Sequence, residues 1–430
     1  MVRSVGSIFA REGLRARMNP TILKALMHDG RPFGVPTGAH RSNVLFFNKK
    51  VLEHAGVSFP SSGYTLAAFL ADLDKVKASG GTPLCLGGKD PFTKVEVFEN
   101  TLLSVIGTRG WKDMVNGNLN WPSGRVRTAL KRFGAMLDYA DPNASRLTWD
   151  QATRKLAAGG CAFETMNDSA FGELVADGAH EGEDFGAIPF PGTDDSFLAV
   201  VDVAATKAKD AKNALAFLSG IEKPATQLAF SRAKGSIPVV RDVNVSSLPA
   251  YQRQSSKAFW TLPVLLSIAH GEALSLQFEE GLYNAVSKYV RTRSPNIRGC
   301  SRERGVQRLH APALIVYQSV PRHARRRGHS GGLLSPHRIV GRFRGGGFHQ
   351  AGAGPRARAE SARGSWWLPV VQNWCNALAQ ARCSETSPAA SSYRSVLVAG
   401  RRVVELMWHT PLGVSRLVVS AELPRSDRVG

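Results

Sequence analysis

Short apolar runs of strand length alternate with helical patterns along the first two thirds of the chain. The run VLFF at residues 44–47 is followed at once by a helical pattern that ends at Gly56. Similar runs at 82–86, 163–166 and 197–207 are separated by further helical patterns. This alternation predicts an α/β fold with a mainly parallel arrangement of strands.

Polar loops are predicted beside two of these strands. One covers residues 38–43 and places His40, Arg41 and Asn43 at the mouth of the first strand, and GGKDPFT follows the strand at 82–86. Such loops often hold small ligands in α/β proteins, because the strand fixes the loop while water still enters. The alternative for residues 38–43 is an ordinary surface turn.

The segment LTWDQATRKLAAGG predicts a capped helix. Thr148 stands at the N-cap, Gln151 follows three residues later, and Gly159 ends the helical pattern. With this spacing each of the two polar side chains accepts a hydrogen bond from the backbone N–H of the other residue. The first residue of this helix is then Trp149.

The last third of the chain differs in composition from the rest. Residues 295–430 contain 21 Arg, no Lys and six acidic residues, so they supply +15 of the formal net charge of +21. We expect this arginine-rich tail to be disordered or irregular, because it lacks sustained periodicity. A shifted or read-through reading frame after about Arg293 explains the loss of Lys. The alternative is an arginine-rich arm that binds nucleic acid.

Several classes of site and segment are not indicated by the sequence. Cys85 and Cys161 lie in apolar runs and are expected to be free core residues, and no cysteine spacing suits zinc. No metal or cofactor is therefore predicted. There is no apolar run of about 18 residues, no signal-peptide pattern, and no nucleotide-binding or nucleophile motif.

Six segments together resemble the sugar-binding proteins of bacterial ABC importers, which form the extracellular solute-binding protein family 1, particularly the glucose/mannose type. In chain order they are HRSNVLFFNKK, GGKDPFT, LTWDQA, VVDVAATK, KGSIPVVRDV and SIAHGEA. None of these motifs is specific by itself, but their common order extends over roughly 250 residues. The resemblance covers about Ser7 to Val290 and ends where the arginine-rich tail begins.

The resemblance implies a two-lobed periplasmic-binding-protein clamp of type II. The chain would begin within the first lobe, so that lobe would be incomplete and its opening strands would have no counterpart here. The implied divisions are 1–35 for the first-lobe remnant, 36–196 for the second lobe, 197–235 for the return to the first lobe, 236–294 for helices that complete the second lobe, and 295–430 for the tail.

The resemblance also implies a sugar site. Trp149 would be the aromatic platform for the sugar ring, while Asp202, Lys234 and His270 would bind hydroxyl groups. Asp202 stands out from the residues alone, because a carboxylate in an apolar strand is costly unless something pairs with it. Its alternative role is a structural ion pair, and that of Trp149 is a core aromatic. Candidates for the rim of the cleft are His40, Asn43 and Phe92.

The predicted function is that of a binding component rather than an enzyme. The ligand would be a monosaccharide such as glucose or mannose, and the partners would be the membrane permease subunits of the importer. We expect a periplasmic or cell-surface monomer that does not bind nucleic acid. Nucleic-acid binding through the tail is one alternative, and a glycan-cleaving enzyme is another, although no spacing singles out a pair of catalytic carboxylates.

Overall fold

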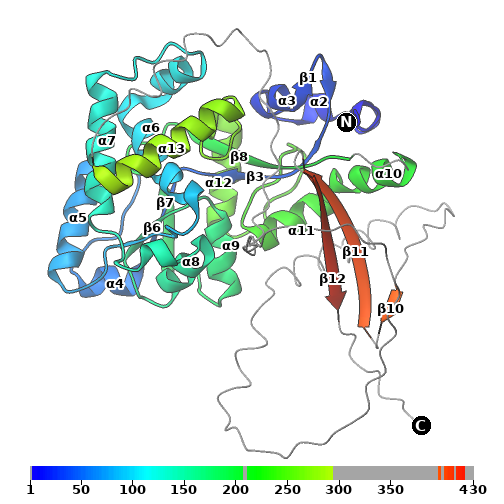
Figure 1. Cartoon of the computed structure of the whole chain (residues 1–430). Coiled ribbons are helices and arrows are strands. Elements are labelled where there is room, and N and C mark those ends of the chain that lie inside the picture. Colours follow the sequence, from blue (N-terminus) through cyan, green and yellow to red (C-terminus); the bar gives the residue numbers. More distant parts are fainter. Residues whose placement is uncertain (1, 207–210, 294–395, 399–400, 411–412, 422–430) are drawn as a thin grey trace, which may run out of the picture.

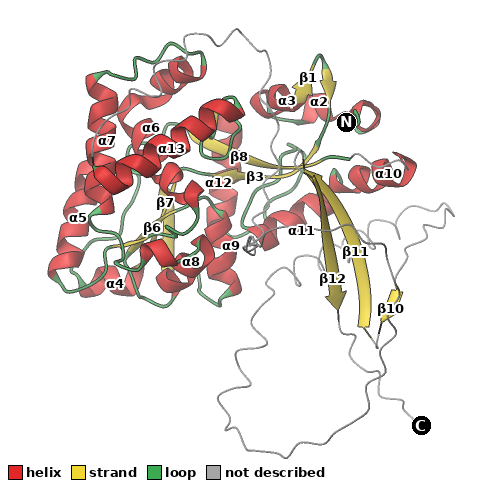
Figure 2. Cartoon of the chain, in the orientation of Figure 1, coloured by secondary structure: helices red, strands yellow, loops and turns green. Residues whose placement is uncertain are grey.

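The computed structural model describes residues 2–206, 211–293, 396–398, 401–410 and 413–421. Before residue 294, the described residues form a two-stranded sheet near the N-terminus and two larger sheets that are surrounded by helices (Figures 1 and 2). A small N-terminal group of elements precedes both sheets: α1 (Gly6–Arg11), α2 (Leu14–Arg17), α3 (Pro20–Leu26), β1 (Met27–His28) and β2 (Arg31–Pro32).

The first lobe is built on a three-stranded sheet. Its strands, in spatial order, are β3 (Val35–Arg41), β8 (Phe197–Ala204) and β9 (Val264–Leu266). The N-terminal helices pack on one face of this sheet together with α10 (Ala211–Ile221), α11 (Pro224–Lys234) and part of α12 (Ala250–Thr261). Figure 1 shows the N-terminal helices, α10 and α11 around the right-hand end of β3 and β8.

The second lobe is built on a four-stranded sheet. Its strands, in spatial order, are β5 (Leu84–Cys85), β6 (Phe163–Thr165), β4 (Val44–Asn48) and β7 (Phe185–Pro189). The helical elements around it are α4 (Lys49–His54), α5 (Leu66–Ala78), α6 (Pro91–Val115), α7 (Gly124–Leu137), η1 (Ala144–Arg146), α8 (Trp149–Ala157), α9 (Ser169–Ala176) and α13 (Leu276–Thr292).

Both sheets are buried on two faces, and alternate side chains enter different cores. In β4, Leu45 and Phe47 join the core with α5, α6 and α7, whereas Val44 and Phe46 join the core with α8 and α9. In β8, Leu198 packs into the core of the second lobe, while its neighbours on either side pack into that of the first. This follows from the two-residue period of a strand. The three-stranded sheet is therefore shared by both lobes.

The strands pair in a mixed pattern. The pairs β3–β8, β4–β6 and β4–β7 are antiparallel, whereas β5–β6 and β8–β9 are parallel. The expectation of a mainly parallel arrangement is therefore wrong. Buried strands have the same apolar sequence in either orientation, so strand direction cannot be deduced from the apolar runs.

The chain passes between the two sheets at several points. Ser42 and Asn43 separate β3 from β4, residues 190–196 lead from β7 to β8, and residues 267–275 lead from β9 to α13. The expected boundary at residue 36 falls inside β3. Helix α12, expected in the second lobe, is shared, because Phe259 packs into the first lobe and the helix start packs into the second.

The tail contains described strands only near its end. They are β10 (Val396–Val398), β11 (Arg401–Thr410) and β12 (Gly413–Ala421), which form an antiparallel sheet where the sequence predicted irregular structure. Residues 294–395, to which the predictions about the tail mostly refer, lie outside the described residues. Within the described part of the chain, no helix is both long and apolar enough to cross a membrane.

Candidate functional site

The segment predicted as a polar loop at residues 38–43 is mostly a buried strand. β3 pairs with β8 along its length, and a Cβ atom at Gly38 would lie 2.7 Å from Ser236 Oγ. Its sequence, VPTGAHR, has few strand-favouring residues, so close packing on both sides imposes the extended form. His40 and Arg41 are consequently buried, with 2% and 5% of their surface exposed, and the surface-turn alternative is also wrong.

His40 lies between two carboxylates. Its Nδ1 is 2.5 Å from Asp168 Oδ1, and its Nε2 is 3.2 Å from Asp202 Oδ2. Burial lowers the pKa of His40, but the charges and hydrogen bonds of the carboxylates, chiefly Asp168, outweigh burial and raise the pKa to about 9. The imidazole is therefore charged at neutral pH, and it joins β3 and β8 to the start of α9 in the second lobe.

Asp202 has the partner that a carboxylate in an apolar strand requires. Burial raises its pKa, but the hydrogen bond from His40 and the charges of Lys234, His40 and His270 outweigh burial and lower the pKa. The side chain remains 36% exposed. Asp202 is thus an ionised group, fixed by His40 and still accessible.

Asn43 has a structural environment. Its Oδ1 accepts hydrogen bonds from the backbone N–H of Leu198 at 2.9 Å and from Nε of Arg41 at 3.2 Å. Its Nδ2 donates to Thr193 Oγ1 at 2.9 Å and to the Ser196 carbonyl at 3.2 Å. These contacts join two of the crossings between lobes. Because Asn43 is fully buried, we leave it out of the proposed ligand contacts.

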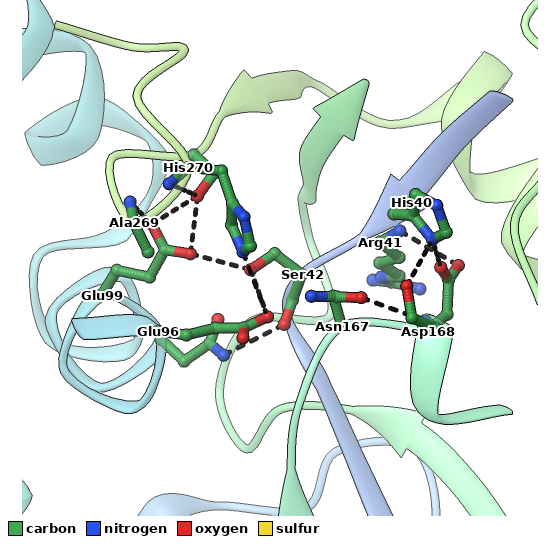
Figure 3. Close-up of polar contacts among 12 residues, drawn as sticks. His40, Arg41, Ser42, Glu96, Glu99, Asn167, Asp168, Ala269 and His270 are labelled. Carbon is green, nitrogen blue, oxygen red and sulfur yellow. Dashed lines mark hydrogen bonds and ion pairs between the residues drawn. The ribbon is translucent and has the colours of Figure 1, made fainter. Parts of the chain in front are cut away.

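Glu99, on α6, holds two crossings at once (Figure 3). Oε1 accepts hydrogen bonds from Ser42 Oγ at 2.7 Å and from Ser267 Oγ at 2.8 Å. Oε2 accepts from Ser267 Oγ at 2.9 Å and from the backbone N–H groups of Ile268 and Ala269 at 2.9 and 3.0 Å. The fully buried carboxylate therefore ties α6 to the chain between β3 and β4 and to the turn after β9.

His270 follows that turn and faces α6. Its backbone N–H donates to Ser267 Oγ at 3.3 Å, and its Nε2 lies 3.9 Å from Glu96 Oε1. Its ring is 5.3 Å from the ring of Phe92. Burial lowers the pKa of His270, but Glu96, with smaller contributions from Glu99 and Glu272, outweighs burial and raises it.

Trp149 and Lys234 are placed by the ends of helices. The capping box of α8 forms as predicted, with Gln151 Oε1 accepting from the Thr148 backbone N–H at 3.0 Å. Trp149 begins α8, donates its backbone N–H to Asp90 Oδ2 at 2.8 Å, and packs at the edge of the same apolar core as Phe92. Lys234 ends α11, where its charge helps to lower the pKa of Asp202 and opposes the burial that raises the pKa of Asp168.

The structure thus brings the predicted residues together in two groups. His40, Asp202 and Lys234 meet around Asp168, and His270 meets Phe92 beside Glu96. The charge of His270 acts on Asp202 and links these groups. Trp149 is connected to the second group, because it packs on the same apolar core as Phe92.

Cys85 and Cys161 form a disulfide, so the prediction of two free core cysteines is wrong. Both residues are buried, and their Cα atoms are 5.7 Å apart. Cys85 lies in β5 and Cys161 just before the parallel neighbour β6, and their separation of 76 positions along the chain conceals this pairing. Among the described residues, no group of three or more His, Cys, Asp or Glu side chains could hold a metal ion.

Comparison with known families matches the part of the chain that builds both sheets. The family described as bacterial extracellular solute-binding protein matches residues 12–227, which include β3, β4 and β8. The chain belongs to this family. Its members are solute-binding proteins and not enzymes, which confirms the predicted family and the predicted lack of catalysis.

Two relatives illustrate the similarity. An ABC transporter extracellular-binding protein of Pyrococcus horikoshii is 28% identical over 287 residues, which make up 66% of this chain and 65% of the relative. A probable sugar-binding periplasmic protein of Mesorhizobium japonicum is 30% identical over 289 residues, 65% of this chain and 68% of the relative. The chain therefore spans about two thirds of the length of these relatives.

The solved structures confirm the predicted fold class. A chitin oligosaccharide binding protein aligns with a TM-score of 0.59 at 18% sequence identity, covering 68% of this chain and 75% of that protein. At this level of identity the likeness concerns the fold alone. The two-lobed α/β fold of this chain is that of a type II periplasmic binding protein.

Sequence reasoning missed several residues of the site. Asp168 and Glu99 were not singled out, although Asp168 accepts a hydrogen bond from the last residue of β3 and Glu99 accepts one from Ser42, just after it. No local pattern marks them, because each acts on residues more than 50 positions away along the chain. An acidic residue inside the apolar pattern of α6 was the one available signal for Glu99.

Proposed function

We propose that this chain is the substrate-binding component of an ABC-type sugar import system. Its ligand would be a monosaccharide such as glucose or mannose, bound where the two lobes meet. The family membership and the name of the Mesorhizobium relative support a sugar as the ligand class. Membrane permease subunits would be the partners, and the protein would act as a monomer.

The observation that carries this proposal is Asp202. It is an ionised and partly exposed carboxylate, held by His40, with the charges of Lys234 and His270 acting on it. Sugar sites combine such fixed charged groups for the hydroxyls with aromatic rings for the C–H faces of the pyranose. Aromatic rings are supplied by Phe92, 5.3 Å from the ring of His270, and by Trp149, which packs on the same core as Phe92.

A location outside the cytoplasm is part of the same proposal. The Mesorhizobium relative is named as periplasmic, and the Cys85–Cys161 disulfide suits an oxidising compartment. Nucleic-acid binding, the alternative function, depends on side chains of the tail. The structure describes no contacts of those side chains.

Calorimetry with the full chain tests the proposal. We expect D-glucose, D-mannose or D-galactose to bind with one-to-one stoichiometry. Asp202→Asn should weaken the binding by about 10- to 100-fold, because a hydrogen bond to a charged group contributes roughly 1.5–3 kcal/mol. Asp195→Asn is the matched control, since Asp195 is exposed and its nearest partner is Thr108 Oγ1 at 3.4 Å.

Two results would refute the proposal. One is a folded wild-type protein that produces no binding heat with any of these sugars. The other is an Asp202→Asn variant that binds as tightly as the Asp195→Asn control. Because Asp202 also pairs with His40, Trp149→Ala serves as a second variant that leaves that ion pair intact. It should weaken binding as well.

A further inference from the structure

Two of the crossings between lobes converge on a single carboxylate. Ser42, between β3 and β4, and the turn at 267–269, between β9 and α13, both donate hydrogen bonds to Glu99. In Figure 3, Glu99 points from α6 toward Ala269, and His270 extends from the same turn toward Glu96. Glu99, which accepts the hydrogen bonds of the turn, therefore lies beside His270, which extends from the same turn.

The contacts require Oε2 of Glu99 to be an acceptor. Oε2 receives two backbone N–H groups, which can only donate, while the hydroxyl of Ser267 is within hydrogen-bond distance of both oxygens. The same hydroxyl oxygen accepts the backbone N–H of His270 at 3.3 Å. A continuous chain of hydrogen bonds thus runs from Glu99 through Ser267 to His270.

The imidazole of His270, whose backbone N–H ends this chain, is partly exposed. His270 Nε2 has no hydrogen-bond partner among the described residues, because Glu96 Oε1 lies 3.9 Å away. The side chain is 13% exposed, and its ring lies against Phe92. Nε2 is buried and forms an ion pair with Glu96, so the exposed part of the ring is the part that a sugar could contact.

We propose that Glu99 is a positioning residue for sugar binding, which fixes the turn at 267–269 so that the exposed part of the His270 side chain faces the ligand. This inference rests on the proposed function, because it assigns His270 to the sugar site. Glu99 itself would not contact the sugar, since it is fully buried and its oxygens are already engaged.

A double-mutant cycle separates positioning from general structural support. We expect Glu99→Gln to weaken D-glucose binding by about tenfold and His270→Ala to weaken it at least as much. The double variant should bind no more weakly than His270→Ala, because Glu99 acts through that side chain. Ser267→Ala, which removes one hydroxyl, should give a smaller loss in the same direction.

Glu222→Gln is the matched control. Glu222 is also a buried acid, but the charges that act on it belong to Arg17, Glu12 and Asp242 in the first lobe. Its replacement should leave the D-glucose affinity unchanged. Additive losses for Glu99→Gln and His270→Ala, or equal losses for Glu99→Gln and Glu222→Gln, would overturn the inference.

A measurement without sugar keeps this inference separate from the proposed function. Two-dimensional NMR of the His270 ring should show a lower imidazole pKa and shifted resonances in Glu99→Gln, because a negative charge is removed and the turn relaxes. Unchanged His270 resonances would overturn the positioning role. A wild-type protein that binds none of the sugars would refute the proposed function, whatever the NMR result.

Discussion

His40 and Glu222 show two ways in which this chain buries an ionisable side chain. His40 has a carboxylate on each ring nitrogen, so burial in its charged form is compensated. Glu222 is 1% exposed, and neither of its carboxylate oxygens has a hydrogen-bond partner among the described residues. Burial raises the pKa of Glu222 to about 8, despite the opposing charge of Arg17. At neutral pH, His40 with its two carboxylates therefore favours folding, whereas the burial of Glu222 opposes it.

Glu222→Gln should stabilise the protein at high pH. A carboxyl whose pKa is raised on folding contributes stability that is fully present below its unfolded value of about 4.5 and is lost as pH rises through about 8. The neutral amide escapes this loss. We expect equal unfolding free energies near pH 4, and at pH 9 an advantage for the variant of roughly 1–3 kcal/mol, the cost of an unpaired buried polar group.

Urea denaturation at both pH values measures this difference. A variant that is less stable than the wild type at pH 9 would mean that Glu222 makes a favourable interaction in its ionised form. Glu183→Gln provides the control, because Glu183 is exposed. This substitution should change the free energy of unfolding by the same small amount at both pH values.

The contact between α9 and α11 depends on Gly235. This residue ends α11 with φ of +83°, and a Cβ atom there would lie 2.2 Å from the Asp168 carbonyl and 2.6 Å from the Gly172 nitrogen. The neighbouring Lys234 is thereby held near Asp168. Backbone packing at this helix end thus sets the distance between two charged groups of the site.

Gly235→Ala should destabilise the protein more than Gly178→Ala. Both glycines have positive φ, of +83° and +85°, but a Cβ atom at Gly178 meets nothing within 4 Å. The left-handed conformation costs about 1–2 kcal/mol for alanine at either position. Overpacking against Asp168 and Gly172 should add roughly 1–3 kcal/mol at Gly235 only. Equal losses in urea denaturation would show that the α9–α11 contact tolerates a methyl group.

Elements with strong local patterns could be predicted from the sequence. The helix that follows residues 44–47 and the capping box at Thr148 are confirmed, because their signals lie within a few residues. β3 could not be predicted, because its extended form comes from β8 and from close contact with Ser236. The disulfide was missed for the same reason, since the pairing of β5 with β6 is not a local feature.

At the scale of the whole molecule, the lobes are joined by polar contacts between the chain crossings. Asn43 ties the first crossing to the second, and Glu99 ties the first to the third. Binding proteins with two lobes close by hinge motion around a ligand. The order of the six motifs predicted this architecture, whereas the contacts that hold the crossings depend on side chains far apart in sequence.

Hydrogen exchange of the full chain, with and without saturating D-glucose, tests the central claim that a sugar binds where the lobes meet. Slower exchange is expected in segments of both lobes: 199–203, 267–271, 87–93 and 148–151. Asp202→Asn should abolish this protection. Unchanged exchange in all four segments, or protection confined to residues after 293, would contradict the account.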